Sequence, residues 1–395
     1  MLPQFWKLSI AGFAATAITY GPARMGFGLF LSEFREVFDL STRDAGLISS
    51  LGFLGMLLGL FVAYGLTARH GARLPVLIGL VSATIGLALV ARAETLAMLY
   101  AGVFLAMSSA GFAWAPFNNA VHQTVPDRDR PTALSLVSTG TSIGIAMAGL
   151  VALVAQTTGF SWRAGWFVFA GLSAVALSVA VADMADVAGR PGPRSSSPWS
   201  ALVRHSARPL YAVALSFGVG SAIYISFAAD RIAQAGGLAA LPGGATPALV
   251  FIAFGLCGLC GLATGALKAR LGLVGLLRAL MLMSAVSMGL VALAPTLWPA
   301  VLVSAGLQGA FVMMTSAILA LWSDRLFPDL PSLSFTVALI AVGVGSVLGP
   351  GLAGAVASRF GGEAMFLGVA ALCLATAAAL RRDRIRERPG RIMTT

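Results

Sequence analysis

The sequence predicts an all-α membrane protein of twelve transmembrane helices in two pseudo-symmetric six-helix bundles. Three observations predict it. Of the 395 residues, 58% are hydrophobic and 10% are charged, with a mean hydropathy of +0.89, whereas soluble domains have about 25% charged residues. The apolar residues gather into stretches of about 20, the length that crosses about 30 Å of hydrocarbon as a helix. One long Pro-, Gly- and Ser-rich segment separates six stretches from six others.

The expected spans account for nearly the whole chain. They are helices rather than barrel strands, because barrel strands alternate in polarity over about ten residues and these stretches are continuously apolar. Pro22, Pro116 and Pro350 fall inside spans and predict kinks, because proline removes a backbone donor. The ranges are 8–32, 44–67, 74–92, 96–121, 132–157, 163–183, 208–232, 246–267, 272–294, 297–322, 332–357 and 363–380.

Basic residues set the expected orientation. Most of the 26 Lys and Arg residues lie in segments that share one side of the predicted membrane, and the positive-inside rule makes that side cytoplasmic. We therefore expect a multi-pass protein of a bacterial cytoplasmic (inner) membrane with both termini cytoplasmic. The net charge of +11 then faces anionic lipid, and no nucleic-acid partner is expected.

The two halves carry traces of one sequence. The segment 66–71 (LTARHG) recurs 201 residues later as 267–272 (LKARLG), and 125–127 (VPD) recurs 202 residues later as 327–329 (FPD). We expect four parts in all: an N-terminal six-helix bundle at 1–183, a cytoplasmic central linker at 184–207, a C-terminal six-helix bundle at 208–380 and a basic cytoplasmic tail at 381–395.

These turns are similar to a known signature. The chain resembles the major facilitator superfamily (MFS), whose turn after span two reads G-x-L-x-D-R-x-G-R-R; here Ala68 and, in the repeat, Ala269 replace the aspartate. The resemblance implies a substrate site near the midplane, alternating access and a charged cytoplasmic gate. We expect that gate to contain Arg69, Arg73, Asp127, Arg128, Arg270 and Asp324.

Arg24 is the only basic residue that we assign to the membrane interior. The others that fall inside the predicted ranges lie toward span ends and are assigned to the flanking segments; they are Arg92, Arg163, Arg208, Arg231 and Arg278. A charge in hydrocarbon costs about 2.5–3.5 kcal/mol or more, so it usually faces protein or water and has a function. Two hypotheses follow: Arg24 binds an anionic group of the substrate, or it pairs with a carboxylate at the outer gate. The full set of expected substrate-binding residues is Tyr20, Arg24, Trp114, Tyr224, Gln308 and Thr315.

Two acidic residues occupy equivalent places in the two halves. Glu33 at the outer end of span one and Asp230 at the outer end of span seven share a Tyr/Phe-Gly…Phe…acid pattern at an offset of 197. Shielding there raises a carboxyl pKa, so these residues are predicted to carry the coupling proton or to form the outer gate.

The sequence predicts a secondary transporter, most simply one that exports a small amphipathic or anionic organic solute in exchange for protons. Proton-coupled import of an organic acid and a non-transporting ligand sensor are the alternatives. An enzyme is not expected, nor are cofactors, because the sequence has no phosphate loop, nucleotide-binding pattern or metal-ligand spacing. Metals are not expected at the CxxC pair Cys257 and Cys260, because it lies in an apolar span without a second ligand pair. The expected partners are the small-molecule substrate, protons and membrane lipid, and the protein is expected to be a monomer.

Overall fold

The computed structural model describes residues 4–185, 207–239, 241, 244–327, 331–381 and 385. Helices are the only regular structure in these residues. Most of the predicted linker and tail lies outside them. In chain order the helices are α1 (Gln4–Tyr20), α2 (Pro22–Leu29), α3 (Leu31–Phe38), α4 (Thr42–His70), α5 (Arg73–Ala91), α6 (Leu96–Gly111), α7 (Trp114–Thr124), α8 (Arg130–Thr158), α9 (Trp162–Asp183), α10 (Arg208–Gln234), α11 (Ala245–Gly258), the 3₁₀ helix η4 (Leu259–Ala263), α12 (Thr264–Leu293), α13 (Trp298–Leu326) and α14 (Pro331–Ala379).

The described helices make the chain an integral, multi-pass membrane protein. Nine helical segments of the described residues are long and apolar enough to cross a membrane. Two of them, Ala245–Leu293 and Ser334–Ala379, exceed one span in length. Each contains a glycine with a non-helical backbone, Gly272 (φ 69°) and Gly361 (φ 85°), close to a turn that the sequence predicts. The total of twelve spans stays a prediction.

Local sequence explains where several helices begin and break. Ser41 caps α4 in a reciprocal box with Asp44, which satisfies free backbone donors of the first turn. The first predicted span breaks at Gly21, and Pro22 starts α2, a place where the absent donor costs nothing. The chain also breaks between α6 and α7, shortly before Pro116. In contrast, α14 continues through Pro350.

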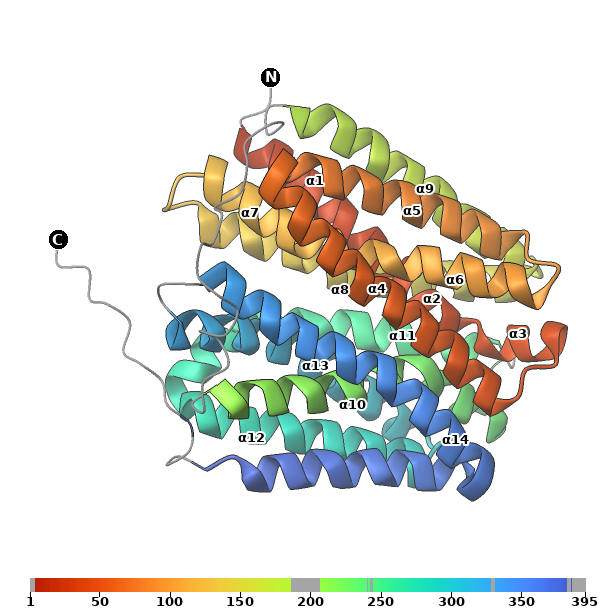
Figure 1. Cartoon of the computed structure of the whole chain (residues 1–395). Coiled ribbons are helices and arrows are strands. Elements are labelled where there is room, and N and C mark those ends of the chain that lie inside the picture. The colour runs from red at the N-terminus through yellow and green to blue at the C-terminus, as the bar shows by residue number, and fades with distance from the viewer. Residues whose placement is uncertain are drawn as a thin grey trace.

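The helices fall into two groups in Figure 1. Helices α1 to α9 lie together in the upper part of the view and α10 to α14 in the lower part. Glycines let the groups approach closely: Gly28 lies against the backbone of Ile225, and Gly46 against that of Pro350. Both contacts are near the end of the molecule where α4 and α11 begin. We call this the outer end and the opposite one, where α4 ends and α10 begins, the inner end, following the predicted orientation.

Candidate functional site

A cavity of about 450 Å³ lies between the two groups of helices. Its lining extends toward the inner end: Asn118 lies in the middle of α7, Leu321 near the end of α13 and Phe335 near the start of α14. At the outer end, the glycine contacts hold the groups together. Among the described residues, the lining therefore reaches toward the inner end, while the two groups touch at the outer end.

Arg24 is the only charged residue among the described residues that line the cavity. Its side chain is buried, and its Nε has no hydrogen-bond partner. The guanidinium lies over the rings of Tyr20 (5.7 Å) and Phe53 (5.6 Å), and such cation–π contacts stabilise a cation without neutralising it. Within the described part of the chain no carboxylate pairs with Arg24, so the cavity offers an uncompensated positive charge.

The two walls of the cavity differ in polarity. Polar side chains gather on the wall formed by α1, α2, α7 and α8. On the opposite wall, the only polar lining residues of α12 and α13 are Thr264 and Ser316. The rest of that opposite wall is apolar and includes the rings of Phe217 and Phe335. The polar residues of the first wall are Tyr20, Arg24, Trp114, Asn118, Ser135, Ser138, Thr139, Thr141 and Ser142.

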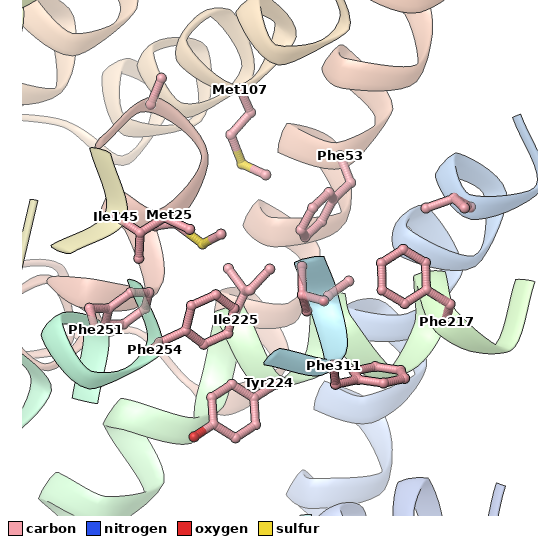
Figure 2. Close-up of a cluster of buried hydrophobic side chains, with 14 of the residues drawn as sticks. Met25, Phe53, Met107, Ile145, Phe217, Tyr224, Ile225, Phe251, Phe254 and Phe311 are labelled. Carbon is pink, nitrogen blue, oxygen red and sulfur yellow. The ribbon is translucent and has the colours of Figure 1, made fainter. Parts of the chain in front are cut away.

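Three of the six expected substrate-binding residues, Tyr20, Arg24 and Trp114, line the cavity. The other three lie in the core of the second group and are not part of the lining. The Tyr224 hydroxyl is 3.1 Å from Ser304 Oγ, and Figure 2 shows it pointing away from the neighbouring aromatic cluster.

The remaining two are also buried. Gln308 Oε1 accepts a long hydrogen bond of 3.4 Å from Ser284 Oγ, while Gln308 Nε2 and Thr315 Oγ1 have no partner among the described residues. Buried side-chain polar atoms usually have partners. A polar residue inside a predicted span is therefore noticeable in the sequence, but the sequence does not show whether its side chain faces the cavity or the core of the helix group.

A cluster of apolar side chains separates the cavity from the outer end (Figure 2). Along α10, Phe217 lines the cavity and packs edge-on against Phe311, with ring centroids 5.4 Å apart. Ile225 follows two turns later beside Gly28 of α2, and Phe53 projects from α4 into the same cluster. All of these side chains are buried.

Beyond this cluster, an ion pair joins the two groups. Arg35 of α3 donates to Asp230 of α10 through Nε (2.9 Å) and Nη2 (3.0 Å), and the side chains are only 16% and 4% exposed. Arg35 also donates to the Leu40 carbonyl (2.7 Å) and to Thr42 Oγ1 (3.2 Å). Asp230 is one of the two residues expected at the outer gate, whereas its partner Arg35 was not predicted from the sequence.

Glu33 lies two residues before Arg35 in α3, beyond the predicted end of the first span. Its Oε1 accepts a hydrogen bond of 2.5 Å from Gln156 Nε2 of α8, and its Oε2 is buried without a partner. The pKa of Glu33 is raised to about 7, chiefly by burial; the charges of Glu36 and Asp230 act in the same direction, and the hydrogen bonds from its own backbone and from Gln156 act against it. Glu33 therefore changes charge near neutral pH.

The expected cytoplasmic-gate residues all lie at the inner end. Arg73 Nη2 donates to the Val181 carbonyl at 3.2 Å, and Asp127 pairs with Arg130 one turn away at 2.6 Å. Arg128 contacts its neighbour Asp129 at 3.3 Å. The side chains of Arg69, Arg270 and Asp324 are exposed. The structure thus places these residues around the open end of the cavity rather than in one network.

The described residues contain no group of three or more His, Cys, Asp or Glu side chains that could hold a metal ion. Cys257 is partly buried and Cys260 is exposed, and both are free thiols.

The cavity between two groups of membrane helices is an arrangement typical of membrane transporters. Residues 9–273 match the family model of the Major Facilitator Superfamily, and the chain belongs to that family. Human monocarboxylate transporter 11 is 33% identical over 162 residues, covering 40% of this chain and 33% of that protein. The mouse protein of the same name is 31% identical over 160 residues, covering 40% of this chain and 35% of that protein. These alignments span about one third of each relative's length.

Solved structures share the fold at low sequence identity. The nucleoside transporter NupG matches 96% of this chain and 98% of its own with a TM-score of 0.70 and 14% identity. A POT family transporter in complex with 5-aminolevulinic acid gives a TM-score of 0.74 at 13% identity, over 95% of this chain and 94% of that one. A bacterial homologue of the human lysosomal transporter Spinster, in an inward-facing and unoccupied conformation, gives 0.67 at 16% identity over 96% and 95% of the chains.

Proposed function

We propose that this protein carries a small organic monoanion across the membrane by alternating access and that protons are the coupling ions. One observation carries the proposal: Arg24 is a buried cation in the cavity, and no carboxylate in the described part of the chain neutralises it. An unpaired charge at membrane depth is costly. A carboxylate on the solute would offset that cost through charge-assisted hydrogen bonds.

The names of the aligned relatives support the same substrate class, because both are monocarboxylate transporters. We propose twelve spans, counted by dividing the two longest helical segments at Gly272 and Gly361 and by including the broken first span. We also propose a monomer in a bacterial cytoplasmic membrane with both termini cytoplasmic, the orientation that the basic residues favour.

Glu33 is the proposed proton carrier. It titrates near neutral pH, and it lies beside the ion pair that joins the two groups. Protonation of Glu33 would remove a negative charge next to Asp230 and thereby change the electrostatics of the closed outer end. Asp230 itself is the proposed outer-gate residue, with Arg35 as its partner.

Two candidate functions differ in the direction of transport. Export in exchange for protons is the first. Uptake of the anion together with a proton is the second, and Arg24 favours it because a carboxylate that binds this cation can move with a proton as a neutral pair. Proteoliposomes with imposed pH gradients of opposite sign separate the two: in exchange the proton and the anion move in opposite directions, and in cotransport they move in the same direction.

The test of the site is transport of labelled organic anions by purified protein in proteoliposomes. We expect Arg24→Ala to abolish exchange of the anion, Arg24→Lys to retain part of it, and Arg92→Ala, an exposed arginine outside the cavity, to transport normally. If Arg24→Ala protein inserts, remains folded and exchanges anions at the unaltered rate, the proposed site is wrong.

A further inference from the structure

On the basis of the proposed function, we infer that the transported solute is an aryl-substituted monocarboxylate: one carboxylate, an aromatic body and no second charge. The inference comes from the difference between the two cavity walls. The wall of the first group holds Arg24 and the neutral polar side chains, and the facing wall presents Phe217, Met313, Phe335 and Leu339. A solute that fits both walls has a charged end and an apolar face.

The volume of the cavity argues against a very small solute. Sites that enclose small organic ligands commonly have volumes of about 300–1,000 Å³, and this cavity is about 450 Å³. A two- or three-carbon acid would bind Arg24 and leave the apolar wall in contact with water. An aromatic ring would instead cover Phe217 and Phe335, where ring–ring contacts in edge-on or offset geometry are favourable.

The single charge of the lining sets the charge of the solute. A second carboxylate would be buried without a cation, because Arg24 is the only charged lining residue in the described part of the chain, and an unpaired buried charge is strongly unfavourable. An ammonium group on the solute fails for the same reason, because the described lining contains no carboxylate. We therefore expect dicarboxylates and zwitterionic amino acids to bind less tightly than a monocarboxylate.

Competition for exchange in proteoliposomes tests this inference. Labelled 3-phenylpropionate is exchanged against three unlabelled competitors, each differing in one feature: lactate lacks the ring, phenylsuccinate adds a carboxylate, and phenylalanine adds an ammonium group. We expect unlabelled 3-phenylpropionate to inhibit at a concentration at least tenfold lower than each competitor. Equal inhibition by any competitor would overturn the corresponding part of the inference.

A charge introduced into the apolar wall provides a second measurement. Leu339 is partly exposed to the cavity, and Leu339→Lys should improve inhibition by phenylsuccinate at least tenfold relative to 3-phenylpropionate, with Leu339→Met as the size-matched control. An unchanged preference in Leu339→Lys protein that still exchanges 3-phenylpropionate would count against the inference. If Leu339→Lys does not fold, the competition in the unsubstituted protein decides.

Different results would overturn the inferred substrate class and the proposed transport function. Arg24-dependent exchange of lactate in preference to 3-phenylpropionate would leave the proposed function intact and overturn the substrate class. Absence of Arg24-dependent exchange for every anion in the panel would overturn the proposed function itself.

Discussion

The ion pair between Arg35 and Asp230 is expected to hold the outer end closed, and breaking it should open that end. Asp230→Asn removes the charge and keeps the shape of the side chain. The pair makes two charge-assisted hydrogen bonds, and bonds of this kind contribute about 1.5–3 kcal/mol each. In an open conformation water would solvate both side chains. Breaking the pair therefore lowers the stability of the closed conformation more than that of the open one.

The magnitude follows from the burial of the two partners. Asp230 is 4% exposed and Arg35 16% exposed, and Arg35 keeps its bonds to Leu40 and Thr42 when Asp230 is replaced. We therefore expect a loss of about 2–3 kcal/mol rather than the full sum of the two bonds. At about 1.4 kcal/mol per factor of ten, the ratio of open to closed molecules rises by about 30- to 150-fold.

Spin-label distances across the outer end measure this ratio. Leu47 on α4 and Phe360 on α14 are exposed and lie at the outer ends of their helices, so cysteines there can carry labels once Cys257, Cys260 and Cys373 have been replaced. Asp230→Asn should add a population at longer distance.

The matched control is Glu363→Gln, an exposed carboxylate at the same end. Arg35→Gln should produce the same population as Asp230→Asn, and the double variant should add little, because each single change already breaks the pair. An unchanged distance distribution in folded Asp230→Asn protein would refute the assignment of this pair to the outer gate.

Two further predictions concern the same end of the molecule. Burial raises the pKa of Glu33 from 4.5 to about 7, so the closed conformation should be most stable below pH 4.5 and lose stability as the pH rises through about 7; the spin-label distances should lengthen over that range, and a Glu33→Gln variant that kept the pH dependence would contradict this. Gly28→Ala should also favour opening, because the added Cβ would overlap the Ile225 carbonyl. Gly289→Ala, where the added Cβ meets nothing within 4 Å, should leave the distances unchanged, and equal behaviour of the two variants would exclude the steric explanation.

The sequence predicted the membrane class and the cavity cation for the same reason. A charge within a long apolar segment is conspicuous, so Arg24 was identified without knowledge of its neighbours, and the structure places it in the cavity lining. The break in the first span was equally visible, because Pro22 cannot continue the preceding helix. Features that depend on one segment can be recognised in that segment alone.

Arg35 was not singled out because its sequence context is ordinary. It lies between Glu33 and Glu36 at a helix end, where a solvated charge is the usual interpretation. Its partner Asp230 is 195 residues away, and only the packing of α3 against α10 brings them together. Gln156 was missed for the same reason, since its role as donor to Glu33 depends on the approach of α8. Contacts between distant segments leave no local signal.

The distance between Arg24 and Arg35 determines how the substrate site and the outer gate can communicate. About 16 Å of helix rise separates them along α2 and α3. At that distance, with an effective dielectric constant of about 20, two unit charges interact by about 1 kcal/mol. This is less than the roughly 2–3 kcal/mol expected for the Arg35–Asp230 pair, so the charge of a bound anion cannot open the gate by electrostatics alone. The remaining route is mechanical, through the contact of Gly28 with Ile225, because α2 contributes Arg24 to the cavity and α10 contributes Phe217 and Asp230 to the two sites. Substrate and proton therefore act on the same pair of helices at different depths.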